Sequence, residues 1–129
     1  MDNTVFKEVD NYISSLLIHE DDILLSVPQT LKDANLPFST VSPNQGKFLQ
    51  IMALACNAKN ILELGTLGGY SAIWLARALP ENGKMITVEI DAARATVAKK
   101  NIERAGSPAK LKYASEREWK YYSNLSERM

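Results

Sequence analysis

A glycine-rich turn between a short apolar stretch and a helical pattern constrains the fold of this chain more than any other feature. Residues 61–64 read Ile-Leu-Glu-Leu, residues 65–69 include three glycines, and residues 70–79 carry apolar side chains at helical spacing. A second, β-branched stretch follows at 85–90, and small apolar residues recur at helical spacing over 95–105. Strand, helix, strand and helix with short connections predict a parallel sheet with right-handed crossovers.

The segment before this unit favours helices. Apolar residues recur at helical spacing over 5–16, and the acids of 20–22 suit the start of a second helix, which Pro28 is expected to end or kink. Ser42 and Pro43 are typical of an N-cap and a first helical position. The apolar face of this third helix is expected to carry Phe48, Ile51, Met52 and Ala55.

The chain length fits one domain. Its 129 residues are enough for a single core and few for two. We expect an α/β fold with a Rossmann-like, doubly wound parallel sheet behind N-terminal helices. We expect residues 1–57 to form the helical segment, 58–112 the βαβα core, and 113–129 an atypical tail.

The charge pattern argues against two classes of partner. The 15 basic and 15 acidic residues balance to a formal net charge of +0 and form no basic stripe, so we expect no nucleic-acid partner. No apolar run approaches the roughly 18 residues that span a bilayer, and the N-terminus lacks signal-peptide features. We therefore predict a cytoplasmic protein without a membrane partner.

The residues that follow the two strands predict a ligand site. Parallel sheets bind ligands at the carboxyl ends of their strands, here just after Leu64 and Val88. Glycine allows the sharp bend after Leu64 and a close approach of backbone to ligand. Glu89 ends the second strand at about the 20-residue spacing from Gly65 at which an acid accepts hydrogen bonds from ribose hydroxyls.

The glycine spacing bears on which cofactor binds. The turn departs from G-x-G-x-x-G, which a pyrophosphate-binding oxidoreductase domain would require, so a nicotinamide cofactor is disfavoured. A sulfonium cofactor brings no phosphate and gains from a nearby carboxylate such as Glu63. The alternative makes Glu63 a solvated strand residue, but Ile61, Leu62 and Leu64 beside it read as buried.

Four other residues are weaker candidates. His19 is the only histidine and has no second ligand or nucleophile near it in sequence, so we assign it no function. Cys56 lies among small apolar residues and is expected to be a buried structural thiol. Tyr70 and Trp74 could stack on an adenine, but aromatic residues one turn apart are more often part of a core.

Several longer motifs resemble the metal-dependent O-methyltransferases related to caffeoyl-CoA and catechol O-methyltransferases. The resemblance covers residues 37–106. It rests on Val-Ser-Pro-Asn-Gln-Gly at 41–46, Ala-Lys-Asn-Ile-Leu-Glu-Leu-Gly-Thr at 58–66, Gly-Tyr-Ser at 69–71, Leu-Pro-Glu-Asn-Gly at 79–83 and Thr-Val-Glu-Ile-Asp at 87–91.

This resemblance implies a class I methyltransferase fold that binds S-adenosylmethionine, with a divalent metal such as Mg²⁺, a small hydroxylated, catechol-like acceptor, and a homodimer. It places Glu63, Gly65, Thr66 and Ser71 at the methionine end of the cofactor, with Val41 closing over it and Glu89 on the ribose. The full set of cofactor-binding residues that we predict is Val41, Glu63, Gly65, Thr66, Gly69, Tyr70, Ser71 and Glu89.

The chain departs from the family after Leu111. No apolar third strand and no Gly-x-Ala turn are visible in the sequence there, and we expect the metal-ligating carboxylates to lie beyond Met129. We therefore assign no catalytic and no metal-binding residue and expect a truncated domain. The alternative function is an inactive cofactor-binding or structural fragment of the family.

Three explanations of residues 113–129 stay open. One codon assignment for 113–122, read one base earlier, gives an apolar strand and a glycine turn, which would indicate a shifted reading frame. The others are a truncation and a native amphipathic helix.

Overall fold

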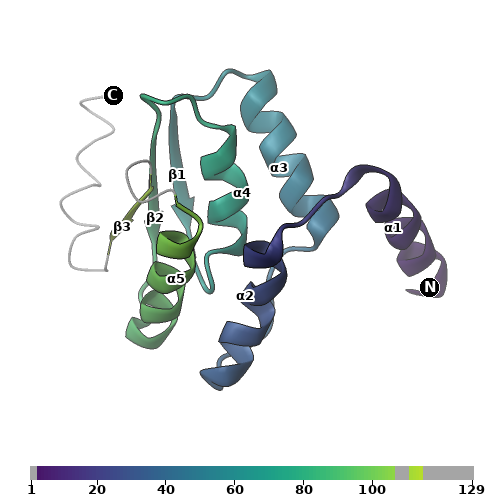
Figure 1. The fold of residues 1–129 in the computed structure, drawn as a ribbon, viewed down its shortest axis with the longest axis horizontal. Coiled ribbons are helices and arrows are strands. Elements are labelled where there is room, and N and C mark those ends of the chain that lie inside the picture. Colours follow the sequence, from purple (N-terminus) through teal and green to yellow (C-terminus); the bar gives the residue numbers. More distant parts are fainter. Residues whose placement is uncertain (1–2, 107–110, 115–129) are drawn as a thin grey trace.

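The computed structural model describes residues 3–106 and 111–114 and has the expected α/β architecture (Figure 1). In chain order the elements are α1 (Asn3–Leu17), α2 (Asp22–Asp33), α3 (Pro43–Ala55), β1 (Asn60–Leu64), α4 (Tyr70–Ala78), β2 (Lys84–Val88), α5 (Ala92–Arg104) and β3 (Leu111–Ala114). Three helices precede the first strand, as the sequence predicts.

The three strands form one parallel sheet in the order β1-β2-β3. Strand β1 pairs with β2 from Asn60 opposite Lys84 to Leu64 opposite Val88. Strand β2 pairs on its other side with β3, where Val88 lies opposite Ala114. The expectation that no third strand is present after Leu111 is therefore wrong for residues 112–114, because backbone pairing with β2 does not require an alternating side-chain pattern.

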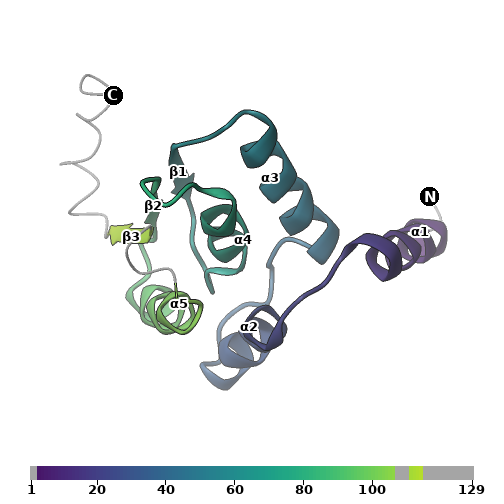
Figure 2. The same cartoon turned by 45° about the horizontal axis from the view of Figure 1, so that its top comes forward.

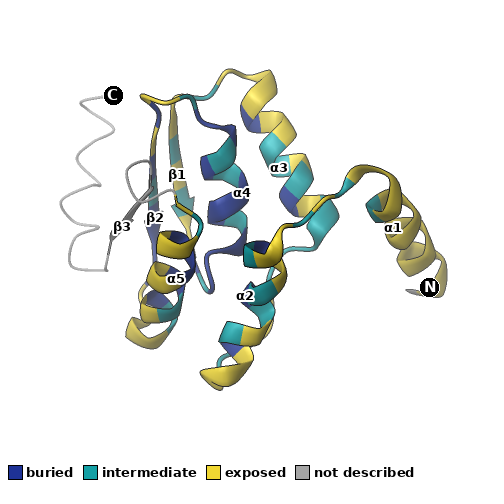
Figure 3. Cartoon of the chain, in the orientation of Figure 1, coloured by how far each residue is buried: buried dark blue, intermediate teal, exposed yellow. Residues whose placement is uncertain are grey.

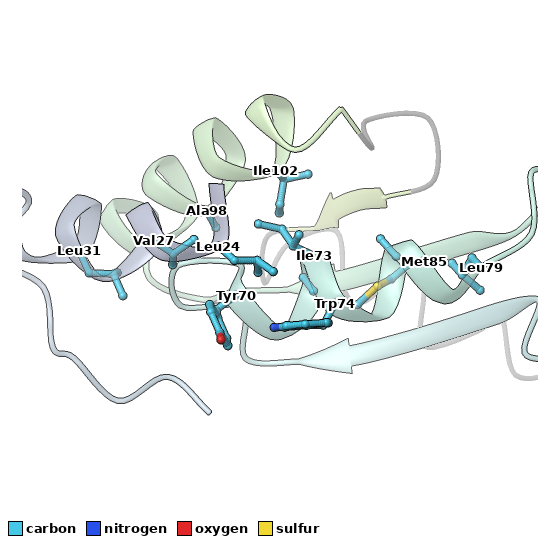
Figure 4. Close-up of a cluster of buried hydrophobic side chains, with 12 residues drawn as sticks. Leu24, Val27, Leu31, Tyr70, Ile73, Trp74, Leu79, Met85, Ala98 and Ile102 are labelled. Atoms are coloured by element: carbon cyan, nitrogen blue, oxygen red, sulfur yellow. The ribbon is translucent and has the colours of Figure 1, made fainter. Parts of the chain in front are cut away.

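Helices α3, α4 and α5 lie on one side of this sheet (Figure 2). Contact of α4 and α5 with the sheet and with α2 buries the main core, drawn in Figure 4. Each large apolar side chain buried there stabilises the fold by about 1.5–3 kcal/mol. The core includes Leu24, Val27 and Leu31 from α2, Ile73 and Trp74 from α4, Met85 from β2, and Ala98 and Ile102 from α5.

The other side of the sheet is open in the described residues. Leu62 and Leu64 on β1 are 49% and 68% exposed, and Ile90 after β2 is 75% exposed (Figure 3). The expectation that both leucines are buried is wrong, because among the described residues β1 is at the edge of the sheet and no helix covers this face.

Helix α2 continues through Pro28. Proline inside a helix removes a hydrogen bond and typically destabilises it by about 3 kcal/mol, so the sequence favours an end there. Leu24 and Val27 before the proline and Leu31 after it are all fully buried. Burial of this face of α2 on both sides of Pro28 outweighs the tendency of proline to end the helix.

The ends of α3 and α5 follow their local signals. Ser42 and Gln45 form a capping box at the start of α3, and Gly106 adopts a left-handed conformation (φ 67°) just after α5. The predicted apolar face of α3 is not buried, however. Instead α3 approaches α4 at Gly46, where an added Cβ would lie 2.4 Å from Cδ1 of Trp74. Phe48, Ile51 and Met52 are 60%, 50% and 50% exposed.

The exposure of the cysteine differs from the prediction. Cys56 is exposed, so the expectation of a buried thiol is wrong: it follows the last turn of α3, on the helix whose apolar face is uncovered.

Within residues 3–106 and 111–114, no helix combines the length and apolar character needed to cross a membrane.

Candidate cofactor-binding site

The turn after β1 has the backbone geometry that its glycines allow. Gly65 and Gly69 have φ of 91° and 82°, values that favour glycine. The turn closes on itself through a hydrogen bond from the N–H of Gly69 to the carbonyl of Thr66 (2.8 Å), and Gly69 then precedes α4. A hydrogen bond from Gly65 N–H to the carbonyl of Val88 (2.9 Å) fixes the turn beside the end of β2.

Glu89 holds the middle of this turn. Leu67 is also left-handed (φ 49°), which is unusual for a residue with a side chain, and its N–H donates to Glu89 Oε2 at 2.8 Å. The other carboxylate oxygen, Oε1, accepts from the N–H of Asp91 at 3.0 Å. Glu89 is only 4% exposed. Sequence reasoning gave Glu89 a ligand role alone, whereas the structure adds this role in fastening the turn.

Two adjoining cavities lie at the carboxyl ends of β1 and β2. The larger, of about 510 Å³, is lined by Ser39, Leu64, Gly65, Leu67, Val88, Glu89, Ile90 and Arg94. The smaller, of about 100 Å³, is lined by Ser39, Thr40, Val41, Gly65, Thr66, Leu67, Tyr70 and Ser71. Because Ser39, Gly65 and Leu67 line both, the two cavities meet at the turn.

The predicted residues differ in how they lie relative to the two cavities. Val41, Thr66, Tyr70 and Ser71 line the smaller cavity, Glu89 lines the larger one, and Gly65 lines both. Gly69 lines neither, since an added Cβ there would lie 3.2 Å from Cγ1 of Ile102 on α5. Glu63 lines neither cavity, but its hydrogen-bond partner Ser71 lines the smaller one.

Glu63 is the acceptor of a small hydroxyl network. The hydroxyls of Ser71 (2.6 Å) and Thr87 (2.5 Å) donate to its two carboxylate oxygens, and the hydroxyls of Thr87 and Thr66 lie 2.6 Å apart. Burial raises the pKa of Glu63, while the hydrogen bonds from Ser71 and Thr87 act in the opposite direction. Glu63 is therefore not the solvated strand residue of the alternative interpretation.

Tyr70 and Trp74 belong to the core, as expected from their spacing. They are 4% and 3% exposed. The phenol of Tyr70 donates to Glu20 Oε1 at 2.6 Å, in the loop before α2. Burial, and then the acceptor Glu20, raise the pKa of Tyr70 above its usual range, so the phenol stays neutral. His19, by contrast, is exposed.

Seven residues that line the cavities are not among the predicted cofactor-binding residues. They are Ser39, Thr40, Leu64, Leu67, Val88, Ile90 and Arg94. The first two precede the Val41 motif in a loop, which carries no local signal for a position beside the turn. Arg94 lies in the first turn of α5, and Ile90 directly follows Glu89, so proximity to the second strand end was the available signal.

The described residues do not build the divalent-metal site that the resemblance implies. Hard cations such as Mg²⁺ require several oxygen ligands, usually including carboxylates. In residues 3–106 and 111–114, no three side chains of His, Cys, Asp or Glu come together as such a set.

Comparison with known proteins bears on this site. A family model described as O-methyltransferase matches residues 14–127. This chain belongs to the O-methyltransferase family. Its relatives include a catechol O-methyltransferase of Niastella koreensis, 61% identical over 106 residues, which are 82% of this chain and 48% of the relative. A catechol O-methyltransferase of Mycobacterium tuberculosis is 42% identical over 77% of this chain and 45% of its own length.

Solved O-methyltransferase structures share the fold. TomG from Streptomyces achromogenes, in complex with S-adenosylmethionine (SAM) and involved in tomaymycin synthesis, matches 97% of this chain with a TM-score of 0.88 and 38% identity. A Bacillus cereus O-methyltransferase in complex with SAH matches 93% with a TM-score of 0.85 and 42% identity. The matches cover 56% and 55% of those chains, so this O-methyltransferase chain spans about half the length of its relatives.

The family match also includes much of the tail that we consider atypical. Residues 115–129 lie outside the described residues. The shifted frame, the truncation and the native helix therefore all stay hypotheses, as do the boundaries at 57 and 112.

Proposed function

We propose that this chain forms the S-adenosylmethionine-binding part of an O-methyltransferase that methylates a hydroxyl of a small, catechol-like acceptor. The observation that carries the proposal is the pair of cavities that meet at the glycine turn, with Glu63 behind one and Glu89 beside the other. The family membership and the SAM complex of TomG support the choice of cofactor.

The chemistry of each cavity suits one half of the cofactor. The smaller cavity, beside Thr66 and Ser71, would hold the methionine part. Ser71 donates a hydrogen bond directly to Glu63, and Thr66 is linked to Glu63 through Thr87. The negative charge of the Glu63 carboxylate favours a positive sulfonium nearby. The larger cavity, with apolar Leu64 and Ile90 beside Glu89, would hold the adenine and the ribose.

Methyl transfer is a displacement at the sulfonium methyl. The acceptor hydroxyl gives its proton to water, and its oxygen forms a bond to the methyl carbon while the carbon–sulfur bond breaks and its electron pair stays on sulfur. The neutral thioether of S-adenosylhomocysteine is left. Rate depends on holding the acceptor in line with that bond, which can contribute roughly 7–11 kcal/mol. In this reaction, the role of the described chain is to bind and orient the cofactor.

Titration calorimetry of the 129-residue chain with S-adenosylmethionine and S-adenosylhomocysteine tests the proposal. We expect both to bind and to slow hydrogen exchange over 63–71, because the turn supplies backbone contacts. Glu81→Gln, an exposed position in the loop after α4, is the control and should leave both affinities unchanged. A folded chain that binds neither ligand contradicts the proposal.

A second candidate function is that of a cofactor-binding chain without turnover. It is favoured by the described residues, which provide the two cavities but no cluster of metal ligands. We expect the isolated chain to bind cofactor and yet not to methylate catechol in the presence of Mg²⁺. A chelator-sensitive methylation signal would contradict this second candidate and direct attention to Glu116 and Glu118 as ligands.

The divalent metal, the homodimer and the cytoplasmic location stay predictions for the whole protein.

A further inference from the structure

The back of the glycine turn is packed against two helices outside the cofactor cavities. Gly68 lies against α2, where an added Cβ would be 2.9 Å from Cδ1 of Leu31 and 3.0 Å from Cγ1 of Val27. Both of these side chains are fully buried. The turn therefore has a front, which lines the cavities, and a back, which contacts the N-terminal helical segment.

One buried polar side chain reaches the back of the turn. Asn101 on α5 is 1% exposed, and its amide nitrogen donates to the carbonyl of Gly68 at 2.9 Å and to Thr30 Oγ1 on α2 at 2.8 Å. A buried carbonyl that loses its donor keeps the cost of its desolvation without a hydrogen bond to offset it. The carbonyl of Gly68 thus depends on this amide for the orientation it has in the turn.

The orientation of that amide is fixed from its other end. Its oxygen, Oδ1, accepts from Nη1 of Arg104 at 3.4 Å, and Nη2 of the same guanidinium donates to Ser26 Oγ on α2 at 2.9 Å. Arginine only donates, so the amide oxygen faces Arg104 and the amide nitrogen faces Gly68. Asn101 joins α2, α5 and the turn in one network.

We propose that Asn101 is a positioning residue for cofactor binding: it holds the glycine turn in the conformation that presents Gly65, Thr66 and Leu67 to the cavities. Asn101 lines neither of the two cofactor cavities, so its effect passes through the carbonyl of Gly68. The effect of Asn101 on cofactor affinity rests on the proposed function. Its effect on the conformation of the turn, which hydrogen exchange measures, rests on the geometry of the turn alone.

The test compares two variants that remove different parts of this network. Asn101→Leu has a similar shape and leaves the carbonyl of Gly68 without its donor. Thr30→Val, the matched control, removes the α2 partner of Asn101 but keeps the bond to Gly68. Both lower the melting temperature, since each removes a hydrogen bond of the α2–α5 contact. Only the first should affect the turn.

We expect Asn101→Leu to weaken S-adenosylhomocysteine binding about tenfold, as the loss of roughly one hydrogen bond at the turn implies, and Thr30→Val to change it less than about twofold. Both are measured well below the lower melting temperature. In the unliganded proteins, the amides of 67–69 should exchange faster in Asn101→Leu than in Thr30→Val.

Equal affinities and equal exchange at 67–69 in the two folded variants would overturn the inference. If the unaltered chain binds no cofactor, the proposed function fails, and the exchange comparison still decides whether Asn101 holds the turn. If Asn101→Leu does not fold, Asn101→Ala takes its place, because it removes the donor without adding volume and gives the same two readouts.

Discussion

The two faces of the sheet differ in burial, most clearly along β1. On the helix-covered face, Met85 and Thr87 of β2 are fully buried and Glu63 of β1 joins the hydroxyl network. On the opposite face, Leu62 and Leu64 are about half or more exposed. Strands of parallel sheets are normally apolar on both sides because both are covered. The covered face thus accounts for the core and the hydroxyl network of the candidate site, while the open face has the composition of a surface that packs against further structure.

The largest expected effect comes from matched truncations on the two faces. Met85→Ala should lower the free energy of unfolding by about 2–5 kcal/mol because it leaves a cavity in the core. Leu62→Ala, on the open face, should change it by less than about 1 kcal/mol. Urea denaturation followed by circular dichroism measures both values. Similar losses for the two variants would mean that the open face is covered in solution.

The second prediction tests the link between the covered face and the turn. Glu89→Ala should weaken S-adenosylmethionine binding by about 1.5–3 kcal/mol, the range for hydrogen bonds to a charged group. It should also speed the exchange of the Leu67 amide, since that N–H loses its acceptor. Calorimetry and hydrogen exchange give the two readouts. Unchanged affinity would place the ribose elsewhere.

The third prediction concerns pH and Glu63. Burial raises the pKa of Glu63 in the folded state above its unfolded value, so folding favours the protonated form. Its contribution to stability is therefore complete below about pH 4.5 and is lost as pH rises through the raised pKa. Glu63→Gln should remove this dependence, so the difference in free energy of unfolding between wild type and variant should change with pH over that window. A constant difference would contradict the assigned direction.

The smallest effect is expected on the open face. Leu64→Lys should change the free energy of unfolding by no more than about 0.5 kcal/mol, because the side chain is 68% exposed. It should nevertheless reduce binding of an apolar fluorescent dye, since it removes part of the exposed apolar surface. Undiminished dye fluorescence would indicate that the dye binds at another surface, such as the exposed side of α3.

Local signals predicted the elements that depend on local chemistry. Ser42 with Pro43 gave the start of α3, the glycines of 65–69 gave the bend after β1, and Gly106 gave the end of α5. Each of these residues acts on backbone within a few positions of itself, so the local sequence alone determines where the helix or turn begins or ends. The same applies to the position of Glu89 at the end of β2.

Features that depend on distant contacts could not be predicted. Pro28 stays inside α2 because of core contacts that the helical segment makes with α4 and α5. Exposure of Leu62 and Cys56 depends on which elements cover them, and strand β3 depends on pairing with β2. The second role of Glu89, as acceptor for Leu67, required the left-handed conformation of a leucine, which no sequence pattern signals.

While Glu63 is ionised, the hydroxyl network behind the smaller cavity has a fixed proton direction. A hydroxyl carries one proton, and Thr87 gives its proton to Glu63, so Thr66 must give its own to Thr87. Ser71 likewise gives its proton to Glu63. With Glu63 ionised, the hydroxyl oxygens of Thr66 and Ser71 therefore have only lone pairs left to offer a ligand. The wall they form accepts hydrogen bonds and donates none through these hydroxyls, a polarity that suits the ammonium group of a bound amino acid better than its carboxylate.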